Sequence, residues 1–198
     1  MKKLFFLLGA ICNLLIACRS TAIATGENGA NLNTVAVTEH ATYTLLPTTA
    51  VEKKIDTVQH FKAQFGKKEI ESDCLLIADE EKLIMTIMNN FGTTMGELNY
   101  NNDLIVFNSE LFPKGVKAAY IVADIQFCLY RADLIQAALE KVGLRCEFSG
   151  TNATNGTEEK IRRIYDGEKE IIHIEKSSGK ITYTNFLRDY AYTLQGEF

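Results

Sequence analysis

The feature that most constrains the fold is a series of short apolar runs, separated by turn residues, that begins near Val58 and continues along the chain. In the first run, Phe61, Ala63 and Phe65 alternate with polar residues, which is typical of a strand with one buried face. Because polar or glycine-containing turns follow most runs, neighbouring strands are expected to pair antiparallel. The pattern predicts roughly nine or ten strands. They are expected at about residues 61–65, 70–78, 83–88, 93–100, 104–108, 146–149, 161–165, 170–175, 181–186 and 190–195.

One segment departs from this strand pattern. Residues 118–142 are largely apolar, and the second half of this segment carries apolar residues at helical spacing. Asp133 favours a first helical turn, and Gly143 suits a C-terminal stop. Because an amphipathic helix must bury its apolar stripe, the sheet is expected to cover it. The sequence therefore predicts a mainly β fold of the α+β class, in which one main helix at about residues 131–142 covers an antiparallel sheet.

The N-terminus is typical of an exported protein. Two lysines after Met1 precede an uncharged run over residues 4–17, which is shorter than the roughly 20 apolar residues of a membrane-spanning helix. Residues 1–17 are therefore predicted to be a signal peptide. The run ends in the sequence Leu-Ile-Ala-Cys, which resembles the bacterial lipobox. The resemblance implies cleavage before Cys18 and attachment of diacylglycerol and an N-acyl chain to this cysteine, whereas the alternative is an ordinary secretory signal with a chance cysteine.

The residues that follow Cys18 indicate where the protein is held. Arg19, not aspartate, comes next, and in proteobacteria this favours sorting to the outer membrane. Residues 18–42 are rich in Ser, Thr, Ala, Asn and Gly and are interpreted as a lipidated flexible tether. A folded domain is expected at residues 43–198, held by the lipid anchor at the periplasmic side of the outer membrane.

Charge and motif content argue against two classes of function. The net charge is −4 and basic runs are short, such as Arg162-Arg163, which we interpret as a solvated strand face and not as a nucleic-acid footprint. The three histidines lie far apart, and HExxH, CxxC and GxSxG motifs are missing, so neither an enzyme nor a metal or other cofactor is expected. His173 and Glu175 share a strand face but lack further metal ligands. The remaining catalytic alternative is acid–base chemistry by Asp124 or His173.

Three cysteines besides Cys18 belong to the predicted domain, namely Cys74, Cys128 and Cys146. In an oxidising compartment an odd number leaves at most two of the three to pair with each other. Each of the three lies among apolar residues, so buried free thiols and one disulfide are both compatible with the sequence.

Two predicted strands, at residues 83–88 and 104–107, are nearly apolar on both faces. Such a strand is either covered on both faces, here by a helix and a loop, or lines a cavity for a hydrophobic ligand. The flexible thioethers of Met85 and Met88 favour the cavity. The candidate lining residues are Leu83, Met85, Ile87, Met88, Leu104, Val106, Leu134 and Leu139.

A family resemblance supports these interpretations. Residues 121–130 (IVADIQFCLY) are similar to the "LaDlQLayWP" segment of an uncharacterised bacterial outer-membrane lipoprotein family that is associated with aryl-polyene and fatty-acid biosynthesis gene clusters. Residues 161–164, 183–186 and 189–190 extend the resemblance, although its distinctive part is residues 124–126, and Tyr-Arg replaces the family's Trp-Pro. The resemblance implies a fold like that of LolA and LolB: an incomplete antiparallel barrel, closed by helices, whose apolar concave face receives acyl chains.

The expected function follows from the anchor, the apolar strands and this resemblance. We expect a monomeric, non-enzymatic lipoprotein that binds or carries an acyl or lipid-like molecule in the periplasm, with a role in lipid or polyene-pigment localisation and a periplasmic carrier protein as a partner. The alternative is a structural or assembly lipoprotein that docks envelope proteins through an exposed sheet edge. In LolB a loop carries an exposed leucine that helps to insert cargo, and the acidic turn at residues 79–81 is the nearest position here.

Overall fold

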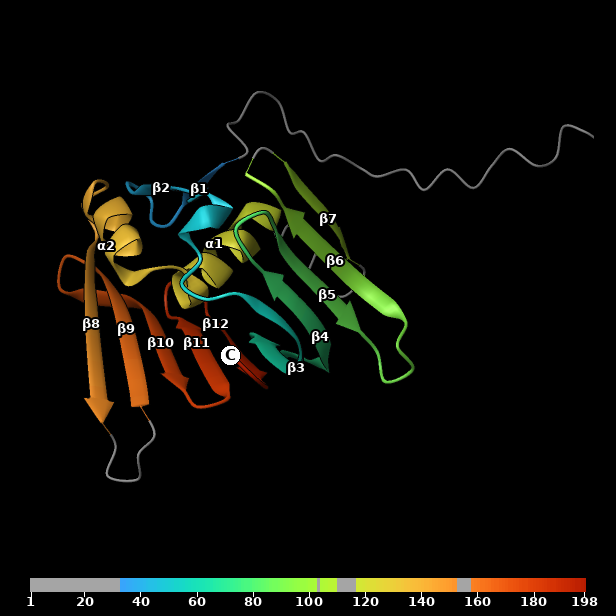
Figure 1. Ribbon diagram of the computed structural model, residues 1–198. Coiled ribbons are helices and arrows are strands. Elements are labelled where there is room, and N and C mark those ends of the chain that lie inside the picture. Colours follow the sequence, from blue (N-terminus) through green and yellow to red (C-terminus); the bar gives the residue numbers. More distant parts are fainter. Residues whose placement is uncertain (1–32, 103, 110–116, 153–157) are drawn as a thin grey trace, which may run out of the picture.

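A ten-stranded antiparallel sheet curves around two helices in the computed structural model of the protein (Figure 1). The structure describes residues 33–198 except 103, 110–116 and 153–157. The predicted signal peptide, Cys18 and the tether up to residue 32 lie outside the described residues. The strands of the sheet are β3 (Ile55–Phe65), β4 (Lys68–Ala78), β5 (Leu83–Met88), β6 (Thr94–Tyr100), β7 (Ile105–Ser109), β8 (Arg145–Asn152), β9 (Glu158–Asp166), β10 (Lys169–Ser177), β11 (Lys180–Asn185) and β12 (Tyr190–Gln195).

The strand order, β7-β6-β5-β4-β3-β12-β11-β10-β9-β8, shows how the sheet is built. The chain enters at the centre with β3 and adds strands outward to β7 at one edge. It then crosses to the opposite edge, continues with β8 and returns strand by strand to β12, which pairs with β3. Within the described residues β7 and β8 do not pair with each other, so the sheet stays open. The predicted mainly β fold with antiparallel strands at these positions is confirmed.

Glycine fixes two of the predicted turns. Gly66 between β3 and β4 has φ +57°, and Gly179 between β10 and β11 has φ +72°, a region that side chains with a Cβ atom rarely adopt. At Gly179 a Cβ atom would also lie 3.0 Å from the backbone oxygen of Gly196. These tight turns hold the hairpins in a register that keeps one face of each strand towards the helices.

Two helices connect the edges of the sheet and lie in its concave face, α1 (Ala118–Leu129) and α2 (Ala132–Glu140) (Figure 1). The predicted single main helix at residues 131–142 corresponds to α2, and the prediction of one helix is wrong because α1 precedes it. From Val122 to Leu129, α1 is buried on every side. A helix that is covered all round has no polar face, so its sequence lacks the apolar stripe by which helices are recognised. None of the described helices is long and apolar enough to cross a membrane.

Residues before β3 cover the side of α1 that faces away from the sheet. The short strands β1 (Thr34–Ala36) and β2 (Thr42–Thr44) pair antiparallel, and a 3-10 turn, η1 (Thr48–Ala50), follows. The ring of Tyr43 lies 4.9 Å from that of Phe127 on α1. The folded part of the chain therefore begins before the predicted boundary at residue 43, since the β1–β2 hairpin packs on α1. Three-residue strands rich in Thr and Ala are too short to show a clear alternation in sequence.

In β5, one of the two strands predicted to be apolar on both faces, the two faces differ in burial. Leu83, Met85 and Ile87 are buried on the concave side, whereas Ile84 and the other residues between them are only partly buried on the convex side. The packing of α1 into the sheet therefore accounts for the inner apolar face of β5. The core of the domain lies between this concave face and α1.

Candidate functional site

The eight residues predicted to line a ligand cavity do not come together in one place. Leu83, Met85 and Ile87 point inward from β5, but Met88 lies on the other face of that strand, Leu104 is 44% exposed and Val106 is partly buried on β7. The remaining two, Leu134 and Leu139, belong to α2, which packs on β8 at the opposite edge of the sheet (Figure 1).

The inward residues of β5 are already packed against protein. Met85 and Ile87 lie beside Leu98 of β6, Phe107 of β7 and Ile121 of α1, and the gap between them has no room for a water-sized molecule. In this structure α1 fills the part of the concave face where the sequence suggested a cavity.

Asp124, which the sequence singled out, connects α1 to the centre of the sheet. Its carboxylate accepts a hydrogen bond of 2.5 Å from the hydroxyl group of Tyr183 on β11 and another from the hydroxyl group of Tyr190 on β12. The amide of Asn185 donates to both hydroxyl groups, at 3.4 and 3.3 Å. Asp124 is only 8% exposed, and burial raises its pKa to about 7, against the opposing effect of the two tyrosines.

Gln126 connects the other side of α1 to the segment that precedes β3. Its side-chain oxygen accepts hydrogen bonds from the hydroxyl group of Tyr43 and the backbone N–H of Leu46, both at 2.9 Å, and its amide donates to the backbone oxygen of Leu46 at 2.8 Å. Residues that are two positions apart in a helix are separated by about 200° around its axis, so Asp124 and Gln126 face opposite sides of α1. The distinctive segment at residues 124–126 therefore holds α1 between the sheet and the β1–β2 hairpin.

Arg162 on β9 lies at the C-terminal end of α1. Its guanidinium donates a hydrogen bond to the backbone oxygen of Tyr130 at 3.1 Å and another to that of Phe127. A cation here satisfies carbonyl groups that have no partner within the helix and lies at the negative end of the helix dipole. The interpretation of Arg162 as solvated is wrong, since only 8% of it is exposed. Strand alternation was the overlooked signal, because it places Arg162 on the same face as the buried Ile164.

A hollow of about 280 Å³ opens beside Arg162, between the α1–α2 junction and strands β8 to β10. In the part of the chain that the structure describes, four charged side chains border it, the cations Lys160, Arg162 and Lys176 and the carboxylate of Glu52. The rest of its lining is largely apolar and consists of Cys128, Ala132, Phe148, Ser149, Gly150, Ile161 and Ile174.

Burial and neighbouring charges shift the pKa of two of the cations at this hollow. Burial lowers the pKa of both Arg162 and Lys176, and the positive charges of Lys160 and Arg162 lower that of Lys176 further. Glu52 is exposed, and its carboxylate lies 3.7 Å from the ammonium group of Lys160. The guanidinium of Arg162 also lies 4.8 Å from the centre of the Phe148 ring. The hollow thus offers apolar walls together with buried positive charge.

All three cysteines of the described domain are buried free thiols. Burial raises the pKa of Cys74, Cys128 and Cys146 to about 12 in each case, so these thiols stay protonated at neutral pH. Cys128 borders the hollow, and its sulfur lies 3.4 Å from the hydroxyl oxygen of Tyr192.

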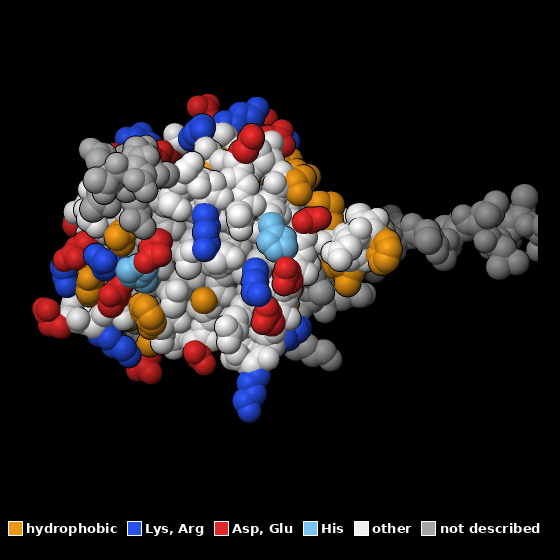
Figure 2. Space-filling model, turned by 90° about the horizontal axis from the view of Figure 1, so that it is seen from below, with side chains coloured by type: hydrophobic (Ala, Val, Ile, Leu, Met, Phe, Trp, Pro, Cys, Tyr) orange, Lys and Arg blue, Asp and Glu red, His pale blue; other side chains and the backbone are white. Residues whose placement is uncertain are grey.

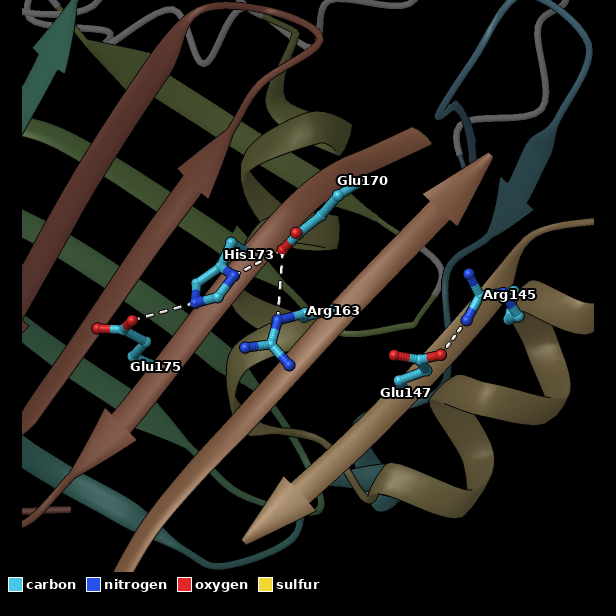
Figure 3. A network of polar contacts seen from close by, with 6 residues as sticks. All are labelled: Arg145, Glu147, Arg163, Glu170, His173 and Glu175. Atoms are coloured by element: carbon cyan, nitrogen blue, oxygen red, sulfur yellow. Dashed lines mark hydrogen bonds and ion pairs between the residues drawn. The ribbon is translucent and has the colours of Figure 1, made fainter. Parts of the chain in front are cut away.

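His173 lies on the convex face of the sheet, away from the hollow. Its Nδ1 and Nε2 atoms lie 2.6 Å from Glu170 and 3.1 Å from Glu175, and Arg163 approaches Glu170 at 3.7 Å (Figure 3). His173 and Glu175 do share a strand face, as predicted. Within the described residues no group of three or more His, Cys, Asp or Glu side chains could hold a metal ion. The convex face mixes Lys and Arg with Asp and Glu (Figure 2).

An exposed aromatic residue marks the tip of the β5–β6 hairpin. Phe91 is 93% exposed, and the side chain of Asn89 fixes the turn by accepting hydrogen bonds from the backbone N–H groups of Phe91 and Thr93 at 2.9 and 3.0 Å. The acidic turn at residues 79–81 is closed by the side chain of Asp79 and presents no apolar residue. Among the exposed large apolar side chains of the described residues Phe91 has the largest exposed fraction, and the acidic turn contributes none of them.

Comparison with known proteins adds one assignment. No match was found among curated protein sequences. Residues 56–196, about 70% of the chain, match a family model described as "Protein of unknown function (DUF3261)". This region includes both helices, all ten strands of the sheet apart from the first residue of β3, and the residues that line the hollow apart from Glu52. The chain therefore belongs to the DUF3261 family.

Proposed function

We propose that this protein is an outer-membrane lipoprotein whose domain binds an acyl or lipid-like molecule in the periplasm, and that the hollow beside Arg162 is the binding site. The observation that supports this proposal is the hollow itself, which has mostly apolar walls and lies at the concave side of an open sheet. Its volume of about 280 Å³ is near the lower end of ligand pockets, so it would hold one part of a longer molecule. A polyene-lipid intermediate is one such molecule.

The apolar walls can supply the binding energy. Each methylene group that leaves water contributes about 0.8 kcal/mol, so even a short stretch of acyl chain against Phe148 and Ile174 would give useful affinity. The lipid anchor at Cys18 would hold the domain close to the membrane that supplies or receives the molecule. Binding and delivery require no bond to be made or broken, in agreement with a non-enzymatic role.

The test is binding of a fluorescent fatty acid to the mature chain carrying Cys18→Ser, after removal of bound lipid. We expect saturable binding at one site, competed by unlabelled fatty acid. Phe148→Asp should abolish binding, because it places a carboxylate on the apolar wall, whereas Phe186→Asp should not, because Phe186 is 52% exposed and lies outside the hollow. If the mature chain carrying only Cys18→Ser bound no fluorescent fatty acid, and mass spectra showed no co-purified lipid, the proposal would be refuted.

The open sheet edges favour a second candidate function. Strands β7 and β8 each have one neighbouring strand among the described residues, and such an edge can accept a strand from another protein. In this alternative the protein is a structural or assembly lipoprotein that docks envelope proteins. Cross-linking of an envelope protein through β7 or β8, with no lipid bound, would favour it over the first.

A further inference from the structure

We propose that the hollow binds the negatively charged head of its ligand, so that the ligand is an anionic amphiphile and not a neutral lipid. This inference rests on the proposed function and specifies the chemical class of the molecule bound at the same site. The head would carry a carboxylate or a phosphate, which share an oxyanion that accepts charged hydrogen bonds. The apolar chain would leave the head along the walls formed by Phe148 and Ile174.

The first argument is the unpaired charge of Arg162. Its two hydrogen bonds to protein go to backbone oxygens, and among the described residues it has no ion pair with a carboxylate. A guanidinium carries five N–H donors, so the helix carbonyls leave donors over for another acceptor. A charge that is nine-tenths buried is costly unless a partner balances it.

Lys176 provides the second argument. It lies on β10 two residues after Ile174, on the same inward face of the strand, and is partly buried. Within the described residues its ammonium group makes neither a hydrogen bond nor an ion pair. Capping of α1 accounts for the position of Arg162 without a ligand. It does not account for a second partly buried cation at the same hollow.

The local charge balance supports the same conclusion. Among the described residues three cations and one carboxylate border the hollow, and that carboxylate, Glu52, lies beside Lys160. The chain as a whole has a net charge of −4, so this excess of positive charge is against the general trend. An anion at the hollow would balance the charges of Arg162 and Lys176, whereas a neutral head would leave both desolvated and unpaired.

The experiment compares three ten-carbon ligands, decanoate, decyl phosphate and decanol, by calorimetric titration of the mature chain carrying Cys18→Ser. We expect at least one of the two anions to bind at least about tenfold more tightly than decanol, with the better anion identifying the head. Lys176→Met, which keeps most of the length of the side chain and removes its charge, should remove most of this preference. Lys169→Met, on the same strand but exposed and outside the hollow, is the matched control.

The outcomes separate this inference from the proposed function. Equal binding of decanol and both anions would overturn the anionic head while leaving lipid binding intact. The same conclusion would follow if Lys176→Met and Arg162→Met, both verified as folded, kept the full preference for anions. If none of the three ligands bound, the proposed function would fail, and this inference with it.

Discussion

Asp124 lies where α1 meets β11 and β12, and both of its carboxylate oxygens accept hydrogen bonds from tyrosine hydroxyl groups. Burial raises its pKa from 3.8 to about 7, and the tyrosines and Arg188 act in the opposite direction. Because the folded pKa is the higher one, its stabilising contribution is fully present below about pH 4 and is lost as the pH rises through 7. We therefore expect the free energy of unfolding to fall between pH 5 and pH 8.

The substitution Asp124→Asn isolates this contribution, because it keeps the shape of the side chain and removes its titration. Relative to the wild type, the variant should gain stability between pH 5 and pH 8, by on the order of 4 kcal/mol at most. Urea unfolding at several pH values measures the difference. Parallel stability profiles of the two proteins would contradict the expected role of Asp124.

Arg162 and Arg163 are neighbours in the sequence but point to opposite faces of β9. Arg162→Met should destabilise the domain by roughly 2–4 kcal/mol, because backbone oxygens at the end of α1 would lose charged hydrogen bonds. Arg163→Met should cost about 0.5 kcal/mol or less, since Arg163 makes a long and partly exposed ion pair with Glu170. Chemical denaturation of both variants tests this contrast, and equal losses would show that Arg162 does not cap the helix.

At the scale of elements, the β5–β6 hairpin exposes Phe91 at its tip. Burial of a phenylalanine side chain in an apolar phase contributes about 1.5–3 kcal/mol. Phe91→Ser in the chain with Cys18→Ser should therefore weaken binding to lipid vesicles about tenfold or more without changing thermal stability. Phe186→Ser is the control because Phe186 is also exposed but lies in another turn. Vesicle sedimentation that gave the same result for both variants would exclude a membrane contact at Phe91.

Elements differed in how far the sequence could predict them. The strands were found because one buried face produces alternation, and glycines such as Gly66 marked the turns between them. Helix α2 was found because one side of it is exposed, whereas α1 was missed because it is covered on every side. Polar residues inside α1 were a usable signal, since Asp124 and Gln126 in an apolar segment must find partners when buried.

At the scale of the whole molecule, the hollow could not be predicted, because it depends on how distant segments pack. Its lining comes from Cys128 on α1, Phe148 on β8, Arg162 on β9 and Lys176 on β10. No local pattern relates these positions. They meet because the chain crosses from edge β7 to edge β8 through the helices, so the end of α1 lies above the inner face of the strands that follow.

The same topology makes β12 the connection between the two halves of the sheet. It pairs with β3, the first strand of one half, and with β11 of the other, and it carries Tyr190, which donates to Asp124 on α1. A chain that ends at Asp189 should therefore lack a cooperative unfolding transition, because β3 and β11 lose their shared neighbour and α1 loses one of its connections.

A chain that ends at Gly196 is the graded control. It keeps β12 and loses only contacts such as the hydrogen bonds from Thr57 and Gln59 to the backbone oxygen of Glu197. Calorimetry should show a single, modestly lowered transition for this control and none for the shorter chain, whereas a cooperative transition in the shorter chain would show that the halves associate through α1 alone.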